Sequence, residues 1–269
     1  MNARIVKFRR AVYAHFRSHG RQLAWRHATD PYGVLVSEIM LQQTQVPRVV
    51  EKYGAFMAAF PTFAALARAR LRAVLRVWQG LGYNRRAVYL HRIARMVMRE
   101  HRGVLPREPA ILATLPGIGP NTAASIAAFG FNAPVVFIET NIRSAFIHEF
   151  FPGRNKVADA SIMPLVAAAL DRRNPRRWYN ALMDYGAMLK RTRENPSRRS
   201  AHHKPQKPFH GSARQLRGRI VARLTAHGGR TAAALAKELG VSNETVAALL
   251  AELCRDGLLK RSGQRYRIA

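Results

Sequence analysis

The chain has 269 residues, of which 48% are hydrophobic, and this is enough to bury a core in one large domain together with a smaller one. Lys and Arg number 45 against 15 Asp and Glu, and the formal net charge of +30 predicts a polyanionic partner, most often nucleic acid, although an arginine-rich proteome would explain part of the excess. No apolar run approaches the roughly 20 residues of a membrane span, and residues 1–10 lack the apolar core of a signal peptide, so we expect a cytoplasmic, nucleoid-associated protein.

Residues 1 to about 195 show the pattern of amphipathic helices separated by turns that contain Pro and Gly. The expected helices are Ile5–Ser18, Pro31–Leu41, Pro47–Ala59, Thr62–Ala69, Leu71–Gln79, Arg85–Glu100, Ala110–Leu115, Asn121–Phe129, Asn141–Phe150, Val157–Leu170 and Arg177–Lys190. A short apolar run, Val135–Ile138, is expected to be extended or strand-like. The pattern therefore indicates a mainly α fold.

The expected helix Pro31–Leu41 carries a single acidic residue, Glu38, among almost wholly apolar neighbours. Burial disfavours the charged form of a carboxyl group, so desolvation should raise the pKa of Glu38. A carboxylic acid that is still protonated near neutral pH is suited to general acid catalysis. On this helix alone, a Glu that faces solvent or pairs with an arginine is the simpler interpretation.

Three polar residues, Gln42, Gln43 and Thr44, follow this helix, and Pro47 starts the next one. They therefore lie at a break between two helices. Such side chains can bond base edges or enter a base stack, and an ordinary polar loop is the alternative.

The segment Leu115–Ala123 reads Leu-Pro-Gly-Ile-Gly-Pro-Asn-Thr-Ala and predicts a tight hairpin between two helices. Gly117 and Gly119 permit close approaches that a Cβ would block, and Pro120 suits the first turn of the second helix. The hairpin thus directs bare N–H groups outward from a helix N-terminus, which is a ready anion site. In so basic a chain the expected anion is a DNA phosphate, and a simple helix–helix turn is the alternative.

A second carboxylate, Glu139, stands where the run Val135–Ile138 ends and a helix begins at Thr140 or Asn141. The positive end of the helix dipole favours an ionised carboxylate there. We therefore expect Glu38 to be kept protonated and Glu139 to be kept charged, a division typical of acid–base or cation-stabilising chemistry. Simple capping of the helix by Glu139 is the alternative.

The composition changes after residue 195, where Pro196–Gly211 is rich in Pro, Ser, His and Lys and predicts an irregular basic linker that lies on DNA or acts as a tether. Three helices and two short strands then indicate a winged helix-turn-helix, in which Ser242 caps the groove-reading helix. These elements are expected at Ala213–His227, Thr231–Leu239, Asn243–Arg255, Leu258–Arg261 and Arg265–Ile268. Such modules bind DNA or other proteins. Cys254 lies in an apolar helical pattern and is expected to be a buried structural thiol.

Six stretches follow one another in the order of a known family. They are Trp25-Arg26, Asp30-Pro31-Tyr32, Ser37–Val46, Trp78–Tyr83, Leu115–Gly119 and Met183–Ala187. Together they resemble the helix-hairpin-helix (HhH-GPD) base-excision DNA glycosylases, and most closely the adenine DNA glycosylases of the MutY type. The resemblance implies two helical lobes with a cleft into which the target nucleotide is flipped, because the glycosidic bond cannot be reached inside the base stack.

The resemblance also implies roles for individual residues. Glu38 would protonate the purine leaving group, and Glu139 would stabilise the oxocarbenium-like sugar or position water. Gln43, Thr44 and Leu81 would probe or wedge the opposite base. Backbone carbonyls of Leu115 and Gly117 would hold a structural monovalent cation. The expected DNA contacts are Arg26, Gln42, Gln43, Thr44, Leu81, Tyr83, Gly117, Gly119, Asn121, Thr122, Arg198 and Arg199.

Several positions depart from the family's pattern. The family usually has Asp where this chain has Glu139, and the extra methylene moves the carboxylate by about 1.5 Å, a displacement that can matter to a rate. Bifunctional relatives have Lys at the position of Asn121, which cannot form a Schiff base, so we expect no strand-cleaving lyase activity. The four-cysteine iron–sulfur loop that should follow Leu189 is replaced by Lys190–Pro196 without a cysteine, so we expect no cluster. A winged helix stands in place of the domain that recognises 8-oxoguanine.

These inferences predict a monofunctional DNA glycosylase that acts on double-stranded DNA with a mismatch or lesion and has no membrane partner. Adenine opposite 8-oxoguanine or guanine is the first expectation for its target. A glycosylase for uracil, thymine or hypoxanthine and a non-catalytic DNA-binding lesion sensor are the alternatives. The expected domains are a glycosylase domain over 1–195, a linker over 196–212 and a winged helix over 213–269.

Overall fold

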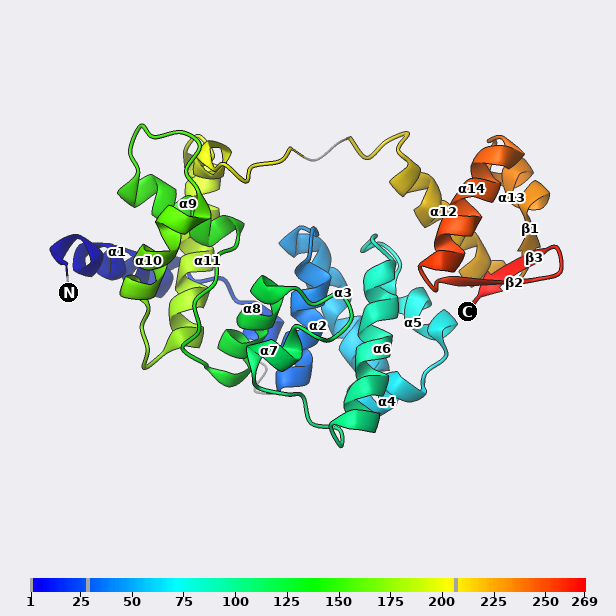
Figure 1. Cartoon of the computed structure of the whole chain (residues 1–269), viewed down its shortest axis with the longest axis horizontal. Helices are drawn as coiled ribbons and strands as arrows, with labels where there is room; N and C mark the ends of the chain where they lie inside the picture. Colours follow the sequence, from blue (N-terminus) through cyan, green and yellow to red (C-terminus); the bar gives the residue numbers. More distant parts are fainter. Residues whose placement is uncertain (1, 28–29, 206–207) are drawn as a thin grey trace. The chain divides into compact units, whose positions relative to one another are not determined.

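The structure, a computed structural model, describes residues 2–27, 30–205 and 208–269 (Figure 1). The chain divides into two compact units. The first comprises Met1–Leu35, Arg107–Thr114 and Ile118–Gln206, and the second comprises Val36–Pro106, Leu115–Gly117 and Lys207–Ala269. The residues of the winged helix thus group with 36–106. Among the residues described, no helix has the length and apolar character that a bilayer crossing needs.

The first unit is helical throughout its regular elements. These are α1 (Ala3–His19), the 3-10 helix η1 (Ala24–Arg26), α7 (Pro109–Leu112), α8 (Pro120–Phe131), α9 (Thr140–Phe150), α10 (Asp159–Ala169), α11 (Pro175–Thr192) and the 3-10 helix η2 (Pro196–Arg199). α11 packs against α1, α8 and α9. α2 (Pro31–Leu41) begins in this unit and ends in the second.

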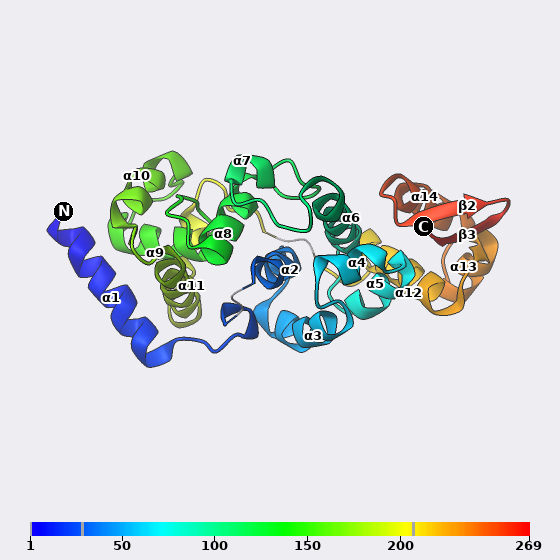
Figure 2. The same cartoon turned by 90° about the horizontal axis from the view of Figure 1, so that it is seen from below.

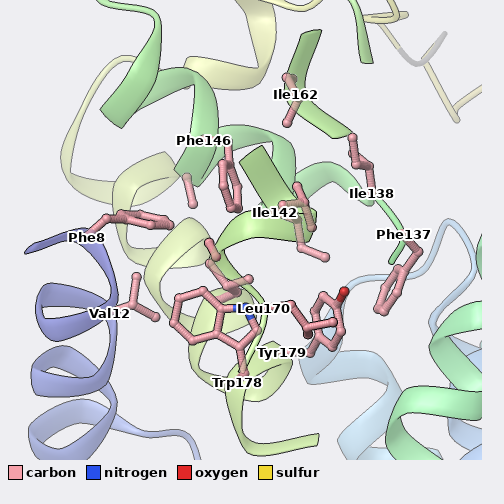
Figure 3. Packing of buried hydrophobic residues seen from close by; sticks show 14 of the residues in the cluster. Phe8, Val12, Phe137, Ile138, Ile142, Phe146, Ile162, Leu170, Trp178 and Tyr179 are labelled. Atoms are coloured by element: carbon pink, nitrogen blue, oxygen red, sulfur yellow. The ribbon is translucent and has the colours of Figure 1, made fainter. Parts of the chain in front are cut away.

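Aromatic and aliphatic side chains together fill the core of the first unit (Figure 3). Ile5, Phe8 and Val12 follow one another at helical spacing on the buried face of α1. The Phe8 ring meets Phe146 of α9 edge-on at 5.0 Å between centroids and Trp178 of α11 at 6.1 Å. This core fixes α9, whose N-cap is Glu139, against α11, which carries Asp184.

The second unit contains a helical part and the winged helix. Its elements are α3 (Val46–Ala59), α4 (Phe63–Arg68), α5 (Leu71–Trp78), α6 (Arg85–Glu100), α12 (Ala213–His227), β1 (Arg230–Thr231), α13 (Ala232–Leu239), α14 (Asn243–Arg255), β2 (Leu259–Ser262) and β3 (Arg265–Ile268). α4 and α5 pack on α6, and α12 packs on α5. β2 and β3 form an antiparallel hairpin beside α14 (Figure 2), and β1 completes the sheet in the order β1-β3-β2.

Most of the predicted elements are confirmed, and the differences are local. β1 was not predicted because only two residues, Arg230 and Thr231, pair with β3. Val135–Ile138 forms no β-bridge with the described residues and is an irregular segment. The Cys254 thiol is half-buried rather than buried, and this burial raises its pKa.

The first part of the predicted linker is ordered and docked. η2 packs on α9, and its residues Pro196 and Ser197 are buried. Ser200 pairs with Val157 through a parallel β-bridge. The prediction of an irregular linker is therefore wrong for 196–200, because Pro196, Ser197 and Ser200 are buried and the segment pairs with the first unit through its backbone. Residues 206–207 of the predicted linker lie outside the described residues.

Candidate active site and DNA interface

The hairpin between α7 and α8 has the predicted form. Gly117 has φ +74°, and a Cβ there would lie 2.2 Å from Cδ2 of Tyr89, so only glycine fits. Gly119 is the N-cap of α8 and Pro120 is its first residue. Because glycine has no side chain to cap the helix, the first amides of α8 are left for an anionic ligand. Gly117, Gly119 and Asn121 are exposed, and Thr122 is half-buried.

One arginine ties the polar loop after α2 to the turn before α6. Arg86 is buried, and its guanidinium donates to the carbonyls of Ile39 (2.9 Å), Met40 (2.7 Å) and Gln42 (2.5 Å). It also donates to Thr44 Oγ1 and to the carbonyls of Leu81 and Gly82. The carbonyls at the C-terminus of α2 carry partial negative charge, which suits a cation. Burial nevertheless lowers the pKa of Arg86 to about 10.

Arg86 is a positioning residue that sequence reasoning missed. Arg86 follows the Gly-Leu-Gly-Tyr turn by only three residues. Its partners at the end of α2 and in the loop after α2 lie 42 to 47 residues away in the chain. Gln42 extends the same arrangement, because its Nε2 donates to the carbonyl of Gly117 at 3.3 Å. The structure thus brings Gln42, Thr44, Tyr83 and Gly117 into one network.

Not every residue of these two loops is presented to solvent. Gln43 is exposed and holds φ +55°, a conformation that places it at the tip of its turn. Leu81, by contrast, is buried, with 2% of its surface exposed. The expectation that Leu81 wedges into the base stack is therefore not supported, because its side chain belongs to the core of the second unit.

Tyr83 is held by a residue of the winged helix. Arg214 of α12 donates to the Tyr83 hydroxyl at 2.7 Å and stacks on the ring, with 5.4 Å between its Cζ and the ring centroid. Arg86 also lies 5.4 Å from the centroid of the same ring. Cation–π contacts of this kind restrain an aromatic ring. The C-terminal residues thus contribute directly to a loop that was predicted to bind DNA.

Glu38 lies on α2 between two buried residues, Ser37 and Ile39, and its own side chain is half-buried. The structure therefore shields this carboxyl only in part, less than the apolar sequence around it led us to expect. A half-buried position is compatible with a group that must reach a substrate.

Glu139 caps α9 with its own carboxylate. Its Oε1 accepts from the backbone N–H of Asn141 (2.6 Å) and of Ile142 (2.9 Å), and its Oε2 accepts from Asn141 Nδ2 (3.2 Å). Capping of the helix N-terminus by Glu139 is thus confirmed. The side chain is fixed by its own helix, so the longer Glu is not left to swing freely.

The pKa of Glu139 is raised in the folded protein, although the dipole of α9 favours the ionised carboxylate. Burial raises the pKa of Glu139. The amides of Ile142 and Asn141 and the charges of Lys190 and Arg143 oppose this rise without cancelling it. Burial thus works against the charged form that we expected for Glu139, and the N-terminal amides of α9 work in its favour.

Asp184 of α11 organises the segment before α2. Its carboxylate is 1% exposed and accepts from Arg26 on both oxygens, at 2.8 Å each, and from Arg21 Nε and the Arg21 backbone N–H. Burial works against the charge, but the hydrogen bonds of Arg26 and Arg21 hold the pKa of Asp184 below its usual value. Two residues later, Gly186 lets α11 approach α9, because a Cβ there would lie 2.1 Å from the carbonyl oxygen of Asn141. The Met183–Ala187 motif thus supports the N-terminus of α9 and Glu139.

Two predicted DNA contacts have structural roles instead. Arg26 is 9% exposed and saturated by Asp184 and by the carbonyls of Arg21 and Asn180. Arg199 is half-buried and donates to the carbonyls of Phe151 and Ile147 at the end of α9. These hydrogen bonds direct both guanidinium groups toward partners within the first unit. Arg198 is exposed and remains a predicted contact.

Residues 36–167 match the family model described as HhH-GPD superfamily base excision DNA repair protein. This span holds Glu38, both polar loops, the hairpin and Glu139. The chain carries an HhH-GPD domain. Residues 214–260 match a winged helix-turn-helix DNA-binding model.

Curated relatives of this HhH-GPD protein are named adenine DNA glycosylase. The protein of Mycolicibacterium smegmatis is 38% identical over 179 residues, which is 66% of this chain and 60% of the relative. The protein of Mycobacterium tuberculosis is 44% identical over 128 residues, 47% of this chain and 42% of the relative. The human protein is 32% identical over 199 residues, 70% of this chain and 36% of the relative. The chain thus spans about half the length of the curated relatives that it matches.

Solved structures share the fold. A thermostable thymine-DNA glycosylase superposes with a TM-score of 0.63 at 23% identity and covers 71% of this chain and 89% of its own. An endonuclease III in a non-covalent complex with DNA superposes with a TM-score of 0.56 at 15% identity and covers 77% and 91%. At these identities the likeness concerns the fold alone.

An iron–sulfur cluster does not fit the residues of this HhH-GPD protein. The only cysteine in the sequence, Cys254, lies on α14 of the winged helix. The segment after Leu189 has Lys190 and a docked 3-10 helix, which Arg199 fastens to the end of α9.

Proposed function

We propose that this chain is a monofunctional DNA glycosylase that hydrolyses the N-glycosidic bond of adenine opposite 8-oxoguanine or guanine. The observation that carries the proposal is the similarity to proteins named adenine DNA glycosylase over a span that includes both carboxylates and the hairpin. The partner is double-stranded DNA with a mismatch or lesion, in the nucleoid. The target base leaves the stack before reaction, because its glycosidic bond is otherwise inaccessible.

Glu38 acts as the general acid in this proposal. It donates a proton to the adenine as the C–N bond to the sugar breaks, so that the base leaves as a neutral molecule. A water molecule then adds to the positively charged sugar carbon and its proton returns to the Glu38 carboxylate, so the products are free adenine and an abasic site. Its half-buried position on a mostly apolar helix leaves the carboxyl within reach of a substrate.

Glu139 stabilises the developing positive charge or orients the water. Only the ionised form can do this, and its ionisation is supported by the amides of Asn141 and Ile142 and by the charges of Lys190 and Arg143. Asn121 offers no amine for a Schiff base, so the abasic site is left uncleaved.

The hairpin amides of this site are proposed to hold a DNA phosphate. The carbonyls of Leu115 and Gly117 are proposed to hold a structural monovalent cation. Hard oxygen ligands of this type suit such an ion, and the Gly117 carbonyl also accepts from Gln42.

Single-turnover base release tests the proposal. Duplexes would carry adenine opposite 8-oxoguanine or guanine, and parallel duplexes would carry uracil, thymine or hypoxanthine mispairs. We expect strand breaks after alkali only in the adenine duplexes, and none without alkali. Release of a different base would reassign the target, and tight binding without release of any base would favour a lesion sensor.

The variant Glu38→Gln separates catalysis from binding. Gln keeps the shape of the side chain but has no acidic proton, so base release should fall by about 100-fold or more, while duplex affinity stays unchanged. Equal loss of binding and release would make Glu38 a structural residue.

A further inference from the structure

A pocket of about 610 Å³ in the second unit shares no residue with the site described above. Residues of α5 and α6 form one side, and residues of the winged helix form the other. Its basic side chains are Arg70, Arg72, Arg92, Arg95, Lys260 and Arg267, and no Asp or Glu side chain is found among the described residues that line it. Six cations of like charge around one concavity repel one another, so the arrangement favours an anionic occupant.

Two of these cations are tied to backbone carbonyls. Arg72 donates to the carbonyls of Thr225 (2.7 Å) and Ala226 (2.9 Å) at the end of α12, and Arg95 donates to the carbonyl of Ala67 at 3.3 Å. Carbonyl partners fix the position of a guanidinium without removing its charge. These two residues therefore contribute a fixed positive potential to the pocket.

The other four cations are exposed: Arg70, Arg92, Lys260 and Arg267. Within the described parts of the chain they have no ion pair, and their side chains make no hydrogen bond to the protein. Because they come from positions as far apart as 70 and 267, only the folded chain brings them together. Their charges are available to a ligand.

Contacts between the end of α14 and helices α6 and α12 join the two sides of the pocket. Gly257, the second residue after α14, has φ +73°, and a Cβ there would lie 2.1 Å from the guanidinium of Arg92. The neighbouring Asp256 pairs with Arg85 of α6 and with Arg217 of α12. The pocket is thus built before any ligand arrives, which reduces the entropy lost on binding.

We propose that this pocket binds backbone phosphates of duplex DNA beyond the stretch held by the hairpin, so that α5, α6 and the winged helix contact the same flank of the duplex. Phosphate is the anion that arginine forks and lysine bind at an exposed, charge-lined surface. Duplex DNA supplies it as a regular array, and the proposed function already makes DNA the partner. The inference rests on that partner and not on base release.

The test compares equilibrium binding of the full chain to two undamaged duplexes, a short one and one longer by about one helical turn, 10 bp, on each side. The pocket variant is R92Q/R267Q, which keeps much of each side-chain stem. The control is R10Q/R173Q, which makes the same charge change at two exposed arginines of the first unit. Anisotropy titrations at several salt concentrations give the slope of log K against log salt.

We expect the wild-type chain to bind the longer duplex more tightly. R92Q/R267Q should lower the slope by about 2 on the longer duplex, one for each lost phosphate contact. It should leave the slope on the short duplex unchanged, and the control should leave both slopes unchanged. Circular dichroism melting verifies that the variants are folded.

Equal effects of R92Q/R267Q on both duplexes, or no effect on either, would overturn the proposal. Tripolyphosphate serves as a competing probe of the same chemistry. If it binds the wild-type chain but not R92Q/R267Q while the longer duplex shows no advantage, the pocket takes a free polyphosphate and the assignment to DNA is wrong. Because all duplexes are undamaged, a failure of base release leaves this result unaffected.

Discussion

At the scale of single residues, the buried Arg86 and Asp184 and the half-buried Glu139 organise this protein. Arg86 donates to carbonyls and a hydroxyl, Asp184 pairs with two arginines, and Glu139 accepts from amides and lies near cations. Removing a charged group from water costs free energy, and its partners offset this cost only while they stay in place. A substitution that removes one of the partners should therefore lower the stability of the fold.

Removal of Asp184 should be strongly destabilising. Asp184→Ala leaves Arg26, 9% exposed, without its carboxylate, and we expect the free energy of unfolding to fall by about 3–5 kcal/mol. Asp159→Ala is the matched control, because its pair with Arg143 is 28% and 14% exposed and should contribute only about 1 kcal/mol. Urea unfolding at pH 7 measures both.

The Asp184 pair also has a defined pH dependence. Its pKa is lowered in the folded state, so its stabilisation is present above the ordinary aspartate pKa and is lost as the pH falls through the lowered value. The gap between wild type and Asp184→Ala should therefore narrow on acidification. A gap that widens at low pH would contradict this interpretation.

The ionisation of Glu139 should affect the pH dependence of both the rate of base release and the stability of the fold. Because its pKa is raised in the folded state, the ascending limb of the pH–rate profile should lie above the ordinary glutamate pKa. The wild-type fold loses stability as the pH rises from that ordinary value through the raised one, since the folded state holds its proton longer.

Glu139→Gln isolates this group. The amide oxygen can still cap α9, but it cannot carry a charge, so base release should be lost. The variant should match the wild type in melting temperature at low pH and exceed it increasingly as the pH rises through the same window. A variant less stable than the wild type at every pH would mean that the charge itself stabilises the fold.

At the scale of elements, glycines set how closely helices approach. Gly186 lets α11 meet the carbonyl of Asn141, and Gly117 lets the hairpin pass over Tyr89. The hydrogen bond from Arg214 to Tyr83 joins α12 to the turn before α6. These contacts position loops and helix ends that carry the candidate functional residues.

Gly186→Ala should separate α11 from α9. The added methyl would lie 2.1 Å from a backbone oxygen, and forced repacking of this kind costs about 1–3 kcal/mol. Gly54→Ala on α3 is the control, because its Cβ meets no atom within 4 Å and should add up to about 1 kcal/mol through helix propensity. Thermal melting distinguishes the two, and equal behaviour would refute the packing argument.

Arg214→Ala should disturb the Tyr83 loop without unfolding the winged helix. Loss of its hydrogen bond and stacking contact would let the ring move, and misplacement of a contact by about 1 Å can slow a reaction by up to about 100-fold. Arg219→Ala, at an exposed position on the same helix, is the control. Single-turnover base release with each variant is the measurement, and equal rates for both would show that Tyr83 does not depend on α12.

At the scale of the whole molecule, the net charge of +30 should govern the proposed association with DNA. Each phosphate contact releases counterions, so a protein with six or more of them should lose about 1,000-fold in affinity between 50 and 200 mM salt. Filter binding or anisotropy over this range measures the slope. A nearly flat slope would contradict DNA as the partner.

The amino-acid sequence by itself determined the local features of this protein. Helix periodicity, the glycine–proline hairpin, the cap at Glu139 and the helix–helix–helix–hairpin order of the winged helix depend on residues close in the chain, so their physical causes are visible in short segments. The ordered motifs also pointed to the HhH-GPD domain.

The tertiary structure alone decided which side chains are free to act. Arg26 and Asp184 are 158 residues apart, and Arg72 reaches carbonyls 153 and 154 residues away, so no local pattern could reveal that these charges are engaged. The burial of Leu81, the raised pKa of Glu139 and the basic pocket likewise arise from packing between distant segments. Desolvation and charge pairing depend on distance in space, and that distance exists only once the chain has folded.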